Sequence, residues 1–187
     1  MTSTAPHASR RGRDALLLLE AIVFTIVVPG TGTIWLPRDV LGLWGAVWPS
    51  PWTVWHVAAL VMMMMGFAVY ARCVWDFAAR GRGIPAPIDH PKQLVVTGLY
   101  RYVRNPMYVG VLLVMLGEAL FFRSLALLGY TLIWFAIVHT VILVYEEPNL
   151  RRKFGHSYDG YAASVGRWIP GRRHHFLEDT EVAEITD

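Results

Sequence analysis

The sequence contains few charged residues and a single cysteine. Asp, Glu, Lys and Arg together make up 17% of the 187 residues, against roughly one quarter in an average soluble domain. Hydrophobic residues make up 55% of the chain and include eight Trp, and the mean hydropathy is +0.39. This balance indicates an integral membrane protein. The length suits one compact unit of membrane helices with no soluble domain of ordinary size beside it.

The low cysteine and charge content also argues against several classes of site. Cys73 has no second cysteine to pair with, which excludes an intramolecular disulfide and any metal or iron-sulfur site built from several cysteines. We therefore expect no metal site. The formal charge of +3 is small, and the basic residues form no stripe interleaved with aromatics, which argues against nucleic-acid binding.

Four apolar stretches come close to the roughly 20 residues that a helix needs to cross a bilayer. We expect an all-α integral membrane protein with transmembrane helices at about 15–36, 53–75, 107–122 and 125–145, all within a single unit covering 1–170. The first stretch carries Glu20 and is interrupted by Pro29 and Gly30, which a membrane helix tolerates as a kink. Because Arg10, Arg11 and Arg13 precede it, a signal peptide is the alternative for this stretch.

Basic residues are unevenly distributed between the loops, which predicts the orientation. Only Arg38 and Arg123 fall in the two loops that would share one side of the membrane. The remaining loops and the N-terminal segment carry Arg10, Arg11, Arg13, Arg80, Arg82, Lys92, Arg101, Arg104, Arg151, Arg152 and Lys153. Both termini, and the long loop before the third span, are therefore expected in the cytoplasm.

The segment after the fourth span shows a helical apolar period. Leu150, Phe154, Tyr158 and Tyr161 recur every three or four residues among charged positions, the pattern of a helix lying on the membrane surface. We therefore expect a C-terminal interfacial helix, although Gly155 weakens it. Residues 171–187 have no apolar period and are expected to be a disordered cytoplasmic tail.

Two cytoplasmic segments contain residues suited to chemistry. The loop from Gly81 to Gly110 holds four prolines, which favour extended or turn backbone over one long helix. Glu146 and Glu147 are adjacent at the end of the fourth span, where two carboxylates repel each other and the negative end of the helix dipole. A cation must compensate them. It is either a bound ligand, or Arg151 and Arg152 acting as local structural partners.

The order and spacing of several motifs resemble the isoprenylcysteine carboxyl methyltransferases and the related phosphatidylethanolamine N-methyltransferases. The resemblance covers roughly Gly66 to Pro170. It rests on the run Gly98-Leu99-Tyr100-Arg101-Tyr102-Val103-Arg104-Asn105-Pro106-Met107-Tyr108-Val109-Gly110, a hydrophobic hairpin, Tyr145-Glu146-Glu147-Pro148, and the later Phe154-Gly155 with Tyr158 and Tyr161. Asn105 stands where the prenylcysteine branch has His, so the lipid-amine branch is locally closer.

The resemblance implies an S-adenosylmethionine-dependent methyltransferase with its site facing the cytoplasm. The cofactor contacts that it implies are Gly66, Gln93, Leu94, Val95, Tyr100, Asn105, Pro106, Met107, Tyr108, Glu146 and Glu147.

The residue types suit this cofactor. Glu146 can accept from its ammonium or ribose, Tyr100 and Tyr108 can pack on its adenine or sulfonium, and Arg104 or Lys92 can bind its carboxylate. His139 lies seven residues before Glu146, about two helical turns, so both are expected on one helix face, where His139 could take a proton from an acceptor amine. A polar contact between helices is the alternative role for His139, and also for Glu118 and Glu20.

One departure from the family pattern bears on the substrate. Ile142 occupies the position where the prenylcysteine enzymes place an Arg suited to the substrate carboxylate, and Arg72, whose default role is to reach the headgroups, is a possible substitute. We therefore expect a membrane lipid or small amphiphilic acceptor with an amine or thiol. The alternatives are a nicotinamide-dependent membrane reductase of the sterol-reductase type, whose N-terminal bundle is missing here, and a non-catalytic helical protein.

Overall fold

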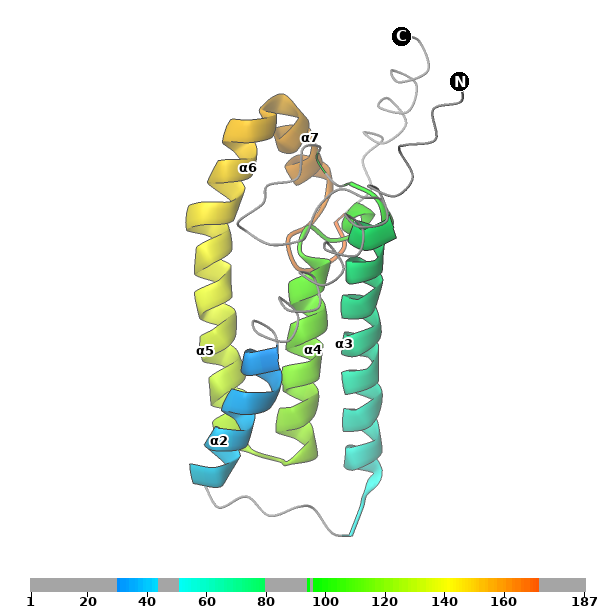
Figure 1. Ribbon diagram of the computed structural model, residues 1–187, viewed down its shortest axis with the longest axis vertical. Coiled ribbons are helices and arrows are strands. Elements are labelled where there is room, and N and C mark those ends of the chain that lie inside the picture. The colour runs from blue at the N-terminus through cyan, green and yellow to red at the C-terminus, as the bar shows by residue number, and fades with distance from the viewer. Residues whose placement is uncertain (1–29, 44–50, 80–93, 95, 172–187) are drawn as a thin grey trace, which may run out of the picture.

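The computed structural model describes residues 30–43, 51–79, 94 and 96–171. These residues form helices and turns, with one isolated parallel β-bridge between Val103 and Gly166. In chain order the helices are the π-helical turn η1 (Thr31–Trp35), α2 (Leu36–Leu43), α3 (Val54–Ala79), the 3-10 turn η2 (Gly98–Arg101), α4 (Pro106–Phe121), α5 (Leu125–Val141), the π-helical turn η3 (Ile142–Glu146), α6 (Glu147–Phe154) and α7 (His156–Ser164). Figure 1 shows α3, α4 and α5 running side by side, with the connections 97–105 and α7 gathered at one end.

Helices α3 and α4 pack closely because small residues line their contact. Ala59, Gly66 and Cys73 follow one another at intervals of seven along α3 and are buried. Seven residues are close to two helical turns, so all three lie on one face. A Cβ added to Gly66 would lie 2.5 Å from the carbonyl oxygen of Gly110 in α4, and one added to Gly110 would lie 2.8 Å from that of Gly66. Small residues of this kind allow membrane helices to approach backbone to backbone.

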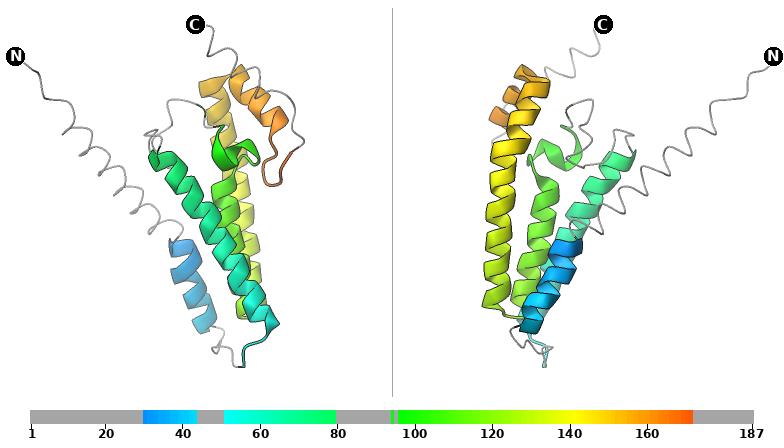
Figure 2. Two further views of the ribbon diagram at one scale, coloured as in Figure 1. Left: turned by 90° about the vertical axis from the view of Figure 1, so that its right-hand side faces the viewer. Right: turned by 60° about the vertical axis from the view of Figure 1, so that its left-hand side comes forward.

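A tight turn reverses the chain between α4 and α5, so the two helices run antiparallel. Ser124 caps α5 by accepting a hydrogen bond from the backbone N–H of Leu127, which satisfies one of the free donors at the helix start. On the other side of α5, the Tyr130 hydroxyl donates to the carbonyl oxygen of Gly32 in η1 at 2.9 Å. The helix formed by η1 and α2 thus packs against α5, and its end approaches the α4–α5 turn (Figure 2).

Two of the described helical segments are long and apolar enough to cross a membrane, namely Val54–Asp76 and Leu125–Phe154, and α4 is a shorter apolar helix. They fall on three of the four expected spans, but the last helix continues well past residue 145. Of the first expected span, residues 15–29 lie outside the described residues. Its described part is helical and extends past the expected end at residue 36, through Pro37 to Leu43. Of the expected tail, 171–187, all but Gly171 also lies outside the described residues.

The expectation of a C-terminal interfacial helix was wrong in its main feature. Gly155, with φ 53°, separates α6 from α7, so the four apolar residues belong to two helices. Tyr158 and Tyr161 are 2% and 4% exposed and pack with Leu150 and Phe154 inside the protein. The apolar period therefore reflects packing against the connection that precedes α4, and these side chains are not a surface for lipid.

Candidate functional site

The segment before α4 is held against the end of α3 by a glycine. Gly98 has φ 64°, a left-handed conformation that other residues adopt only at a cost. A Cβ there would also collide with the buried carboxylate of Asp76, which forms an ion pair with Arg72 at 3.2 Å. This pair gives Arg72 a structural partner on its own helix. Gly98 thus fixes the start of the turn that carries Tyr100.

The turn η2 is covered by α7. The Tyr161 hydroxyl donates to the backbone carbonyl of Tyr100 at 2.7 Å. Burial raises the pKa of Tyr100, Tyr158 and Tyr161 above their usual range, so all three remain protonated hydroxyls at neutral pH. Leu94, one of the expected cofactor contacts, packs against Tyr158 and Tyr161.

The backbone of Arg104 and the side chain of Asn105 each donate a hydrogen bond to the segment that follows α7. The backbone N–H of Arg104 donates to the carbonyl of Gly166 at 2.9 Å, next to the bridge between Val103 and Gly166. The amide Nδ2 of Asn105 donates to the carbonyl of Arg167 at 3.3 Å. Asn105 stands at the N-cap of α4 without capping it through its side chain, and Pro106 begins the helix, where its missing N–H costs nothing.

Glu146 lies across from the start of α4 and bonds to Tyr108. The Tyr108 hydroxyl donates to Glu146 Oε1 at 2.6 Å, and the Tyr108 ring packs edge-on against Trp134 of α5 with centroids 6.3 Å apart. Glu146 closes the π-helical turn η3. Such a turn contains one extra residue and frequently occurs at functional sites. The structure therefore brings together two of the residues expected at the cofactor from segments 38 positions apart.

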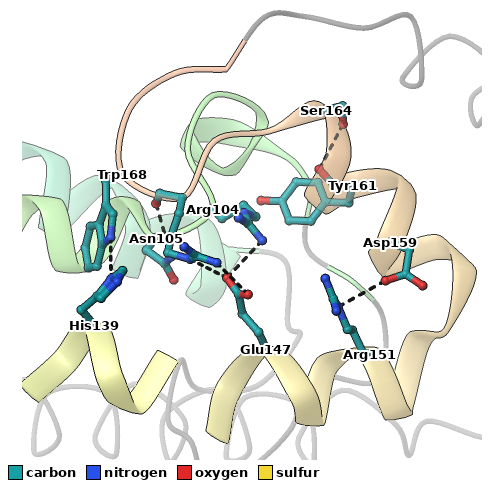
Figure 3. Close-up of polar contacts among 10 residues, drawn as sticks. Arg104, Asn105, His139, Glu147, Arg151, Asp159, Tyr161, Ser164 and Trp168 are labelled. Atoms are coloured by element: carbon teal, nitrogen blue, oxygen red, sulfur yellow. Dashed lines mark hydrogen bonds and ion pairs between the residues drawn. The ribbon is translucent and has the colours of Figure 1, made fainter. Parts of the chain in front are cut away.

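Glu147 has quite different surroundings. It is 8% exposed, and Arg167 binds it with both ends of the guanidinium fork, Nε to Oε1 at 2.7 Å and Nη2 to Oε2 at 3.0 Å. Arg104 Nη1 lies 3.1 Å from the same Oε1. Figure 3 shows the Arg104 and Glu147 side chains turned toward each other from opposite sides of the site. The cations that form ion pairs with Glu147 therefore come from outside its own helix, and Arg151 of α6 adds a longer-range attraction.

The expected local partners of the glutamate pair have other contacts. Arg151 pairs with Asp159 of α7 at 3.3 Å, with both side chains more than half exposed, and Arg152 bonds to Asn149. The prediction of local ion pairs from these two arginines was thus wrong, although Arg151 still exerts a longer-range charge attraction on Glu147. Arg104, expected to bind the cofactor carboxylate, is instead engaged with Glu147 and has a side chain only 12% exposed.

Glu146 has no cation within ion-pair distance among the residues that the structure describes. Its hydrogen-bond partner among the described residues is the neutral Tyr108 hydroxyl, and the side chain is half-buried. A carboxylate removed from water is costly without a countercharge. The arrangement leaves Glu146 able to accept from a positively charged or hydroxyl-bearing ligand.

His139 is placed differently from the expectation. The π-helical turn between it and Glu146 adds one residue, which rotates Glu146 by about 100° relative to a continuous α-helix. The two side chains therefore do not share one face. His139 Nδ1 accepts from Trp168 Nε1 at 3.0 Å, so the lone pair of a neutral ring is already used, and His139 also stacks on Phe135. These contacts favour its structural alternative.

Of the other expected contacts, Gly66 has a different role and two cannot be placed. The position of a Cβ on Gly66 is occupied by α4, so Gly66 serves helix packing, and its expected cofactor contact stays a prediction. Met107 packs against the cluster of Tyr70, Val111 and Met115 below the site. Gln93 and Val95 lie outside the described residues.

The sequence analysis missed Gly166, Arg167 and Trp168. All three contact site residues, although the segment after α7 has no apolar period and no family motif to mark it. The need for a positive charge beside the two glutamates was the one signal in the sequence that could have led to Arg167, and it pointed to the nearer arginines Arg151 and Arg152.

Comparison with known proteins matches most of the segments that form the site to one family. Residues 54–157, more than half of the chain, match the phospholipid methyltransferase family. The chain belongs to this family. Two rice proteins, from Oryza sativa subsp. indica and subsp. japonica, are each 30% identical over 124 residues, and both are named probable protein-S-isoprenylcysteine O-methyltransferase. The alignment spans 64% of this chain and 62% of each rice protein, so it leaves more than a third of those relatives unmatched. The family match begins at α3 and ends near the start of α7, and it includes both Tyr108 and Glu146.

Proposed function

We propose that this protein is an S-adenosylmethionine-dependent membrane methyltransferase that acts on a lipid or small amphiphilic acceptor. The observation that carries the proposal is the contrast within the glutamate pair. Glu147 is neutralised by two arginines, whereas Glu146 is bound by an uncharged hydroxyl alone among the described residues. In a family of methyltransferases, the cationic cofactor is the countercharge that Glu146 lacks.

The residues at the site fit that cofactor in kind. S-adenosylmethionine supplies an electrophilic methyl group on a sulfonium. Glu146 would accept from the ammonium or the ribose hydroxyls, and Tyr108 holds the Glu146 carboxylate in place through the 2.6 Å bond. Asn105 and Tyr100 would lie beside it on a backbone fixed by Gly166 and Tyr161. Methyl transfer depends on alignment and on exclusion of water more than on a strong base, which agrees with a site without a free histidine among these residues.

We propose four membrane spans with both termini and the site on the cytoplasmic side. The outward faces of α3 and α5 support this, because they carry exposed apolar residues such as Met64, Phe67, Ile133 and Ile137. The basic residues Arg151, Arg152 and Lys153 lie at the same end as the site, as expected for the cytoplasmic side. The acceptor would then reach the site from the bilayer, and the cofactor would reach it from water.

An amine or thiol acceptor is favoured over a prenylcysteine carboxylate. Ile142, which occupies the position of the substrate-binding Arg in prenylcysteine enzymes, is 1% exposed. An acceptor carboxylate would meet no charge there, and Arg72 is paired with Asp76. Methylation of a prenylcysteine carboxylate is the second candidate function, and the names of the two rice relatives favour it.

The test has two stages on detergent-purified protein. Calorimetry should detect S-adenosylmethionine binding, and absence of binding would reject the proposed activity. Methyl transfer from labelled cofactor should then be measured in mixed micelles to phosphatidylethanolamine, to a long-chain thiol and to a farnesylcysteine analogue. We expect transfer to an amine or thiol. Transfer to the farnesylcysteine analogue alone would show that the prenylcysteine candidate is correct.

A further inference from the structure

Residues Val165–Trp168, here called the strap, cross the front of the site and are attached to it at four points. Gly166 bonds to the backbone of Arg104, the carbonyl of Arg167 accepts from Asn105, the Arg167 side chain binds Glu147, and Trp168 donates to His139. The strap thus joins the segment that begins α4 to the helix that carries the glutamates (Figure 3).

Glu147 is the point where these elements meet. Its Oε1 is shared by Arg167 and Arg104 and its Oε2 is bound by Arg167. The bond with Glu147 raises the pKa of Arg167, so the guanidinium stays charged. A forked charge-assisted pair of this kind fixes direction as well as distance. With both oxygens occupied inside the protein, Glu147 acts as an anchor and is not free to bind the cofactor.

The anchor controls the position of the neighbouring carboxylate. Glu146 ends η3 and Glu147 begins α6, so the backbone that orients one orients the other. Arg104 precedes Asn105 and lies four residues before Tyr108. Because Arg104 and Arg167 bind the same carboxylate, that of Glu147, they fix the separation of Tyr108 and Glu146, whose hydrogen bond is 2.6 Å.

We propose that Arg167 is a positioning residue for cofactor binding, and that the strap sets the geometry of the Tyr108–Glu146 pair through Glu147. The inference rests on the proposed function. Arg167 lies beyond residues 54–157 that match the family, so the family match does not assign it this role. Its effect belongs to affinity for the cofactor, since it acts through Glu147 on the Tyr108–Glu146 pair that would bind the cofactor.

The experiment compares Arg167→Gln and Arg167→Lys with Arg151→Gln. Arg151 is a matched control because its ion pair with Asp159 also starts from α6, but it leads to α7 and both partners are exposed. For each folded variant, the cofactor Kd is measured by calorimetry, and the KM values for cofactor and acceptor and kcat are measured by labelled transfer. Melting temperatures in detergent identify variants that fail to fold.

We expect Arg167→Gln to raise the Kd and KM for S-adenosylmethionine on the order of tenfold, the effect of uncoupling two groups that act together. The acceptor KM and kcat should stay near the wild-type values. Arg167→Lys keeps the positive charge without the forked guanidinium, so its cofactor Kd should lie between those of the wild type and Arg167→Gln. If Arg167→Gln does not fold, the Kd of Arg167→Lys tests the inference. Arg151→Gln should bind cofactor as the wild type does.

A purely structural role gives a different result. A partly inactive preparation would lose apparent kcat in proportion to its inactive fraction and keep its KM, and that outcome would overturn the inference. So would a cofactor Kd in the Arg167 variants equal to that of Arg151→Gln, while the wild type binds. If the wild type itself binds no cofactor, the proposed function fails, and this inference fails with it.

Discussion

At Glu146 and Glu147, two adjacent residues of the same type have opposite electrostatic surroundings. Glu147 is buried and bound by Arg104 and Arg167, and Glu146 is half-buried and bound by the Tyr108 hydroxyl. Replacing each in turn should therefore have different consequences, because one substitution removes a structural anchor and the other removes the proposed cofactor-binding carboxylate.

We predict that Glu146→Gln weakens S-adenosylmethionine binding by a factor on the order of 10 to 100. This is the effect of losing a charge-assisted hydrogen bond of about 1.5 to 3 kcal/mol. The melting temperature should change little, since a Gln can still accept from Tyr108. Calorimetry on the purified variant measures the affinity, and an unchanged affinity in folded protein would assign Glu146 to structure.

We predict that Glu147→Gln lowers stability more than Glu146→Gln does. It leaves Arg104 and Arg167 without their shared carboxylate, and breaking a buried pair costs roughly 3 to 5 kcal/mol. Thermal unfolding of the two variants in the same detergent provides the comparison. Equal melting temperatures would show that the two arginines find solvent or another partner.

At the scale of elements, the contact between α3 and α4 depends on the lack of side chains at Gly66 and Gly110. Their backbones approach so closely that a Cβ on either would overlap the other helix. This contact holds α4, including Tyr108 in its first turn, at a fixed distance from α3. A third glycine, Gly129 in α5, has open space around it and serves as a comparison.

We predict that Gly66→Ala destabilises the protein by about 1 to 3 kcal/mol, because the helices must separate to admit the methyl group. Gly129→Ala should leave stability unchanged or raise it by up to about 1 kcal/mol, the gain in helix propensity. Denaturation of both variants in detergent tests this. A Gly66→Ala variant as stable as the wild type would mean that α3 and α4 can move apart freely.

At the scale of the whole molecule, the described elements place two sets of connections at opposite ends. The end of α2, the start of α3 and the α4–α5 turn lie at one end, and η2, α6 and α7 lie at the other (Figure 1). Positive residues concentrate at the second end. A membrane crossed by these helices would therefore separate the site from the α4–α5 turn.

We predict that Leu43→Cys and Leu125→Cys label from outside intact cells, whereas Arg152→Cys labels only after permeabilisation. All three positions are exposed, and the native Cys73 is buried, so the unmodified chain is the control. A membrane-impermeant maleimide reports accessibility. Labelling of Leu43→Cys and Arg152→Cys from the same side would overturn the proposed topology.

The sequence by itself determined the helical class, the positions of three apolar helices and the family, because apolar stretches and motif order can be read along the chain without knowing how it folds. It also singled out Tyr108 and Glu146, which the fold then joins. The tertiary structure alone decided which arginines compensate Glu147, since Arg167 is distant in sequence and no motif marks it. It likewise decided that a π-helical turn rotates Glu146 away from the face of His139, and that Tyr158 and Tyr161 face protein. In each case the sequence gives residue spacing, whereas partner and direction depend on how separate helices pack.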